Sequence, residues 1–209
     1  MGEAGPMGGM ARLDDQMRFV TEIGRLKAVL RQTVLAGEGL GRPENSAEHS
    51  WHLAMMAQVL AEHAPPGTDL SRVTGMVLLH DVVEIDTGDL FLYAEEEQQR
   101  RQELAERAAA DRIFALLPGD QGALLHHLWD EFMARRSPEA KFARALDRLQ
   151  PMLENFRSGG GTWKRHGITA DQVLAKVELI EDGSASLGTF ARSLVGQAVS
   201  DGILAPAVG

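Results

Sequence analysis

The sequence predicts a single domain of the all-α class, and three observations support this prediction. Apolar residues recur at helical spacing along most of the 209-residue chain. We find no stretch in which apolar and polar residues alternate with enrichment of β-branched residues, as they do in strands. Short clusters of Gly, Pro and Asp separate the helical stretches. We therefore expect one helical bundle over residues 13–205, preceded by a disordered, glycine-rich lead over residues 1–12.

The N-terminal half is predicted to contain three helices. The first covers residues 13–36. The second covers residues 46–63, and Asn45 stands at its N-cap with Glu48 three residues later, which is the arrangement of a capping box. The third covers residues 70–84 and is apolar on almost every face, which is typical of a buried helix.

The C-terminal half is predicted to be helical as well. A polar helix over residues 95–117 is expected to expose most of its charged side chains to solvent. Helices over residues 120–135 and 138–156 follow, the latter with proline at its first position. The glycine-rich segment 158–167 is interpreted as a flexible connector, and two further helices fill residues 169–204.

The composition excludes several classes of protein. Lys and Arg number 21 against 30 Asp and Glu, so the net charge is −9, and an acidic surface repels the phosphates of nucleic acid. No window approaches 18 consecutive apolar residues, so no membrane span is expected. The N-terminus lacks the features of a signal peptide. The absence of Cys excludes disulfides, thiolate ligands and a Cys nucleophile. We expect a cytoplasmic protein without nucleic-acid or membrane partners.

Ionisable residues at the end of the third helix are the first candidates for chemistry. His80 and Asp81 follow four apolar residues, and burying two adjacent ionisable groups costs several kcal/mol unless a partner compensates. A metal ion and a salt-bridged pair both remain open as that partner. Glu84 lies one helical turn beyond His80, where its carboxylate can hold or deprotonate a water molecule. His49, in the first turn of the second helix, can supply a second nitrogen.

Other conspicuous residues are given structural roles. His52 lies one turn beyond His49 and is interpreted as a core or hydrogen-bonding residue rather than a ligand. His126 and His127 lie within an ordinary amphipathic pattern, which argues against a second metal site. Trp51 and the pair Met55–Met56 are predicted to be core.

Four segments of the chain carry a resemblance to a known family. They read LKAVLR, RPENSAEHS, HDVVEIDTGD and EAKFARALDRL, and together they span about residues 19–156. In this order they resemble the HD superfamily of metal-dependent phosphohydrolases, and within it the bacterial 5′-deoxynucleotidases and their human HD-domain-containing relatives. The resemblance implies an HD-type helical bundle that hydrolyses nucleoside or deoxynucleoside 5′-monophosphates. Hydrolysis of a nucleoside triphosphate, an alarmone or a cyclic phosphodiester stays open, as does a non-catalytic nucleotide-binding protein.

The resemblance also implies one divalent metal ion, with Mn or Co expected first and Fe, Zn or Mg as alternatives. Asp147 lies nearly opposite the apolar stripe of its helix, so periodicity alone favours a solvated side chain. Ala140 and Ala143 leave room for a neighbouring helix on that side, and the resemblance assigns Asp147 to the metal. The implied ligands are His49, His80, Asp81 and Asp147.

The remaining site residues follow from the same resemblance. Glu84 corresponds to the residue that orients or activates the attacking water, and Asp89 to an acidic residue of the active site. Arg31, expected on the first helix, corresponds to the residue that binds the substrate phosphate. Gln32 stands where the deoxynucleotidases have a Trp beside the sugar, which predicts looser discrimination between ribose and deoxyribose. The resemblance and the apolar stripe of residues 142–156 also favour a homodimer.

Overall fold

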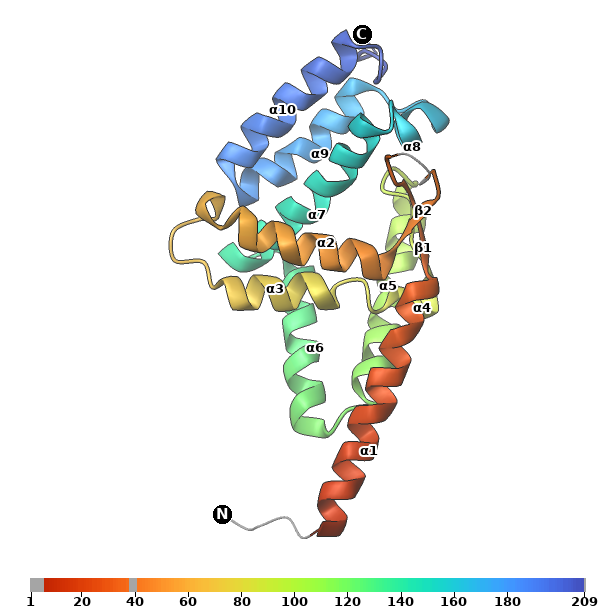
Figure 1. Ribbon diagram of the computed structural model, residues 1–209, viewed down its shortest axis with the longest axis vertical. Coiled ribbons are helices and arrows are strands. Elements are labelled where there is room, and N and C mark those ends of the chain that lie inside the picture. Colours follow the sequence, from red (N-terminus) through yellow and green to blue (C-terminus); the bar gives the residue numbers. More distant parts are fainter. Residues whose placement is uncertain (1–5, 38–40, 209) are drawn as a thin grey trace.

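The computed structural model describes residues 6–37 and 41–208 as a helical bundle with one two-stranded sheet (Figure 1). This confirms the predicted all-α class. None of the helices in these residues is long and apolar enough to cross a membrane. In chain order the elements are α1 (Pro6–Ile23), the 3₁₀ helix η1 (Gly24–Ala28), β1 (Leu30–Val34), β2 (Pro43–Asn45), α2 (Ser46–Val59), the 3₁₀ helix η2 (Ala61–His63), α3 (Leu70–Leu79), α4 (Glu84–Thr87), α5 (Glu96–Phe114), α6 (Gly119–Ala134), α7 (Pro138–Arg157), α8 (Gly161–Arg165), α9 (Ala170–Gly183) and α10 (Ala185–Ser200).

The N-terminal helix differs from the prediction at both ends. It begins at Pro6, so residues 6–12 of the expected disordered lead are helical, while residues 1–5 lie outside the described part of the chain. It ends at Ile23 rather than at residue 36. Figure 1 shows α1 extending away from the body of the molecule as an arm.

A short antiparallel hairpin replaces the last part of the predicted first helix. Strand β1 pairs with β2, and the amide of Ser46 also donates to the carbonyl of Val29 at 3.0 Å. The β-branched residues Val29, Thr33 and Val34 favour extended backbone, but the hydrogen bonds that fix it come from a segment about ten residues further along the chain. Arg31 therefore lies on a strand and not on a helix.

Helix α2 begins as predicted, with reciprocal hydrogen bonds between Asn45 and Glu48 that form a capping box. Its buried face carries His49, Leu53 and Met56, which confirms the predicted core position of Met56. Trp51 and Met55 lie on the opposite face and are 64% and 47% exposed, so their assignment to the core is wrong.

The predicted third helix is broken at the position that matters for chemistry. Helix α3 ends at Leu79, residues 80–83 form a turn, and Glu84 begins the short helix α4. Within this turn the amide of Val82 donates to Leu79 and that of Glu84 donates to Asp81, which is the tighter 3₁₀ spacing. The turn presents His80 and Asp81 to the interior at the end of a buried helix.

Helix α7 lies at the centre of the bundle and packs against α2, α3, α6, α9 and α10. Ser137 caps its N-terminus by accepting from the amide of Ala140, next to the predicted first-position proline. Ala140 and Ala143 are fully buried. Helix α7 is therefore covered on this side as well as along its apolar stripe, as expected from the room that these two alanines leave for a neighbouring helix. The segment expected as a flexible connector contains the short helix α8.

Candidate metal centre and active site

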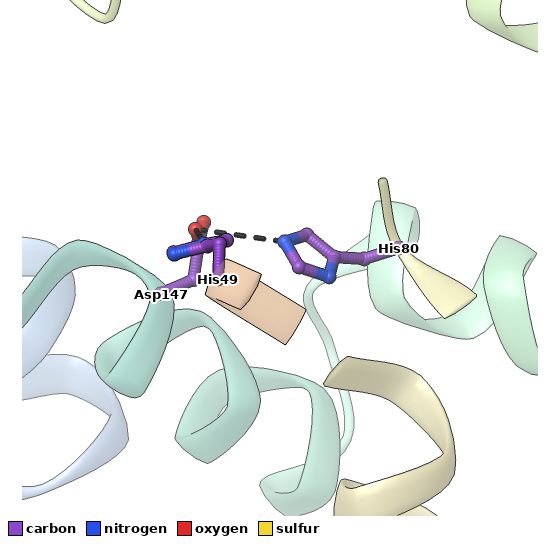
Figure 2. A group of neighbouring side chains, drawn as sticks. All are labelled: His49, His80 and Asp147. Atoms are coloured by element: carbon purple, nitrogen blue, oxygen red, sulfur yellow. Dashed lines mark hydrogen bonds and ion pairs between the residues drawn. The ribbon is translucent and has the colours of Figure 1, made fainter. Parts of the chain in front are cut away.

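Three buried side chains converge from three separate elements. His49 comes from the first turn of α2, His80 from the turn after α3, and Asp147 from the middle of α7. Figure 2 shows their polar ends pointing toward one another. One ligand atom from each lies within 4.8 Å of the others. Nε2 of His49 is 3.1 Å from Oδ1 of Asp147, and Nε2 of His80 is 3.7 Å from the same oxygen.

Hydrogen bonds on the far side of each imidazole determine which nitrogen faces the centre. Nδ1 of His80 donates to the carbonyl of Val77 at 2.9 Å. Nδ1 of His49 donates to Oε1 of Gln150 at 3.1 Å, because the amide nitrogen of Gln150 itself donates to Glu44 at 2.8 Å. Both rings therefore turn Nε2 toward Asp147, an orientation typical of histidines that bind metals.

The chemistry of these atoms fits a cation at the centre. Nε2 of His80 is buried and has no hydrogen-bond partner among the described residues, although Oδ1 of Asp81 lies 3.0 Å away. Burial lowers the pKa of His80, but the carboxylates of Asp81 and Asp147 outweigh it and raise this pKa to about 10. The field that favours a proton on Nε2 also favours a metal ion that displaces the proton.

Asp81 lies at the edge of this group and joins it to Arg31. Its Oδ1 faces His80, while its Oδ2 accepts a 2.7 Å hydrogen bond from Nη1 of Arg31. Burial raises the pKa of Asp81, but His80 and Arg31 outweigh burial and lower it to about 2, so the group is a carboxylate. Its Oδ1 lies 3.0 Å from Nε2 of His80, but Asp81 is outside the group of ligand atoms that lie within 4.8 Å of one another.

Glu84 is buried and the side chain of Asp89 is 10% exposed, and both carboxyl groups lie on the wall of the same cavity. Ser46 donates to Glu84 at 2.6 Å, and burial together with repulsion from Asp81 raises the pKa of Glu84 well above its usual range. Asp89 accepts from the backbone amide of Gln32 at 2.8 Å, and burial raises its pKa as well. Both groups therefore bind a proton more readily than an exposed carboxylate does.

The side chain of Arg31 is 10% exposed and lies among carboxylates, although Arg31 is on a different element from the one predicted. Besides its bond to Asp81, its Nε lies 3.5 Å from Glu44 and its Nη1 lies 3.9 Å from Asp89. Gln32, the next residue, is exposed and lines the same cavity. Residues 31 and 32 therefore both line this cavity.

Four polar residues of this region were not predicted from the sequence. Glu44 and Gln150 form the hydrogen-bonded chain behind His49, and Arg144 and Arg148 flank Asp147 on α7. Burial raises the pKa of Asp147, but Arg148, His49 and His80 together outweigh burial and keep this pKa well below the usual range. The spacing of Arg144 and Gln150, each three residues from Asp147, is a helical signal that could have identified both.

The histidines that were predicted not to bind the metal, His52 and His126, lie outside the group formed by His49, His80 and Asp147. His52 contacts Gln150, with Nδ1 3.4 Å from its amide nitrogen. His126 is held between Asp111 and Asp130 at 3.0 Å each, on the packed pair α5 and α6. The centre opens into a cavity of about 270 Å³, close to the size range of small-molecule sites.

A helical bundle that gathers two histidines and an aspartate around one buried centre defines a class of metal-binding helical domain. Comparison with known families specifies the class further, because the HD domain family matches residues 23–187. The chain belongs to the HD domain family.

Individual relatives agree with this assignment. Human 5′-deoxynucleotidase HDDC2 is 32% identical over 141 residues, which cover 66% of this chain and 65% of the human protein. A 5′-deoxynucleotidase of Erwinia tasmaniensis is 27% identical over 76% of this chain and 83% of its own length. The crystal structure of a predicted metal-dependent phosphohydrolase from Magnetospirillum magnetotacticum MS-1 is 52% identical, with a TM-score of 0.88 over 93% of this chain and 96% of that one.

Proposed function

We propose that this protein is a metal-dependent phosphohydrolase that removes the 5′-phosphate from nucleoside and deoxynucleoside monophosphates. One observation carries the proposal: two buried imidazoles turn their Nε2 atoms toward the carboxylate of Asp147 at the wall of an open cavity, and Nε2 of His80 has no hydrogen-bond partner among the described residues. The names of the human and Erwinia tasmaniensis relatives, both 5′-deoxynucleotidases, support the choice of substrate.

The proposed metal ligands are two imidazoles and two carboxylates. This donor set suits Mn, Co, Fe or Zn better than Ca, and we propose Mn or Co as the activating ion. When bound, the ion acts as a Lewis acid on the phosphoryl group and lowers the pKa of a water molecule. The ligands are His49, His80, Asp81 and Asp147.

The other site residues then take complementary roles. Glu84 orients the attacking water and accepts its proton, a role that its raised pKa supports. Arg31 offsets the charge of the phosphoryl group from beside Asp81. Asp89 holds strand β1 over the cavity through the amide of Gln32 and completes the acidic set of the active site. Gln32 faces the sugar, where its amide can bond a 2′-hydroxyl.

The test is release of inorganic phosphate from a panel of ribo- and deoxyribonucleotides with Mn, Co, Zn and Mg. We expect 5′-monophosphates to be hydrolysed to nucleoside and phosphate with a bound Mn or Co ion. Triphosphates, an alarmone and cyclic phosphodiesters belong in the same panel. Release of pyrophosphate, opening of a cyclic diester, or nucleotide binding without turnover would replace the proposal with the corresponding alternative.

We also propose a cytoplasmic homodimer. The face of α2 that carries Trp51, Met55 and Val59 exposes three large apolar side chains, and such surfaces commonly mark protein contacts. The lack of Cys is consistent with a reducing compartment. Light scattering on the metal-loaded protein gives the assembly state, and a monomer at micromolar concentration would contradict the proposed dimer.

A further inference from the structure

Two arginines of α7 stand beside the metal centre without the hydrogen bonds that buried guanidinium groups require. Nη1 of Arg144 is 3.8 Å and Nη2 of Arg148 is 3.4 Å from Oδ2 of Asp147. Their side chains are only 14% and 15% exposed, and both line the cavity. In the part of the chain that the structure describes, Nε of each is buried without a hydrogen-bond partner. An unpaired buried donor costs free energy unless a ligand satisfies it.

Arg144 and Arg148 have fewer neighbouring carboxylates than Arg31 has. Arg31 lies within 4 Å of three carboxylates, those of Glu44, Asp81 and Asp89. Among the described residues, the ion pairs of Arg144 and Arg148 are with Asp147 alone. Asp147 turns its other oxygen toward the histidines, so a metal ion there would take up its negative charge.

The surroundings of the two arginines add cations rather than anions. Lys176 of α9 lines the same side of the cavity, and its pKa is lowered by burial and by repulsion from Arg148 and Arg144. Glu106 of α5 also lines the cavity, but it forms no ion pair with either arginine in the described structure. This wall therefore carries an excess of positive charge next to the metal centre.

We propose that Arg144 and Arg148 form an anion subsite that binds the non-esterified oxygens of the phosphoryl group, opposite Arg31. This inference rests on the proposed function and assigns its substrate class. The planar fork of arginine matches phosphate oxygens with paired N–H donors. A phosphomonoester carries two negative charges and can pair with both guanidinium groups, whereas a phosphodiester carries one and leaves a buried cation unpaired. The subsite thus selects monoesters over diesters.

Direct binding of inorganic phosphate to the metal-loaded protein tests the subsite. Arg144→Gln and Arg148→Gln should each weaken phosphate binding, measured by calorimetry, by about 10- to 100-fold, as expected for a lost charge-assisted hydrogen bond. Metal content should stay that of the wild type. Arg148→Lys should restore part of the phosphate affinity. The control is Arg157→Gln, which removes an exposed arginine from the same helix.

Steady-state kinetics test the selectivity. With p-nitrophenyl phosphate and bis(p-nitrophenyl) phosphate as probes, the glutamine variants should raise KM for the monoester and leave KM for the diester nearly unchanged. Wild-type affinity for phosphate in both glutamine variants would overturn the inference, and so would loss of the metal together with phosphate binding. If the glutamine variants do not fold, Arg144→Lys and Arg148→Lys decide, because unchanged phosphate affinity in both lysine variants would overturn it.

The outcome is separable from the proposed function. If phosphate binding depends on both arginines but no nucleotide is hydrolysed, the proposed function fails and the subsite stands. If nucleoside monophosphates are hydrolysed while phosphate binding ignores both arginines, the function stands and the subsite fails. Absence of phosphate binding in the wild type refutes the subsite.

Discussion

Replacing Gln150 with leucine removes the link between Glu44 and His49, the proposed ligand histidine of α2. Gln150 is fully buried, accepts from Nδ1 of His49 at 3.1 Å and donates to Glu44 at 2.8 Å. The variant leaves one buried donor and one buried acceptor without partners. At about 1–3 kcal/mol for each unsatisfied group, we expect a loss of about 2–6 kcal/mol in the free energy of unfolding.

The same change should weaken metal binding by a separate route. Without an acceptor at Nδ1, the imidazole of His49 is free to carry its proton on Nε2 and donate to Asp147, which removes the lone pair that faces the centre. Loss of a group that orients a ligand histidine typically lowers metal affinity about 10- to 100-fold. Gln150→Glu is the informative partner, because it keeps an acceptor for His49 but sets a carboxylate against Glu44.

Denaturant unfolding of the chelated protein and a metal titration measure the two effects separately. Gln197→Leu on the exposed face of α10 is the matched control and should change neither quantity. If Gln150→Leu binds metal with wild-type affinity, the hydrogen-bonded chain does not orient His49, and the tautomer argument is refuted.

Four further predictions concern the reacting side chains. Glu84→Gln should keep the fold and the metal, measured by elemental analysis, while turnover falls by about 10²–10⁴-fold because an amide cannot accept a proton; unchanged turnover would make Glu84 structural. Asp147→Ala should lose most bound metal on gel filtration, and retention would remove it from the ligand set. Arg31→Lys should raise KM for nucleoside monophosphates despite its charge, because an ammonium lacks the planar fork; unaltered kinetics would exclude a phosphate contact. The side chain of Gln32 should allow ribonucleotides to be hydrolysed at rates comparable to deoxyribonucleotides in matched assays, and a strong preference for deoxyribonucleotides would contradict its proposed role.

Helix starts could be predicted from the sequence where residues next to the start make the capping hydrogen bonds. The capping box at Asn45 and the Ser-Pro start of α7 place two helix starts within the residues that make the hydrogen bonds. The hairpin was missed because β1 depends on hydrogen bonds from β2, and a helical apolar pattern does not reveal a non-local partner. The break after Leu79 was missed because no Gly or Pro marks it, and Val82 and Val83 continue the apolar pattern beyond His80 and Asp81.

Some residues of the candidate site could likewise be predicted from local sequence, and others could not. His80, Asp81 and Glu84 are close in sequence, so their common location could be predicted, although a turn and not a continuous helix brings them together. Asp147 could not, because its own helix suggests solvent exposure and the small residues beside it only allow burial. The roles of Glu44 and Gln150 become visible only when β2 and α7 are brought together, 106 residues apart along the chain.

That long separation has a consequence for when the ion enters and leaves. His49 and Asp147 are 98 residues apart, so no single helix or hairpin can present both, and a partly folded chain lacks the binding site until α7 docks onto α2. Metal loading is then coupled to the last stage of tertiary assembly and stabilises only the fully docked state. Conversely, each transient undocking of α7 opens an escape route for the ion. The rate at which a chelator removes metal would therefore report the opening of the bundle's central helix, a motion far slower than side-chain rotation.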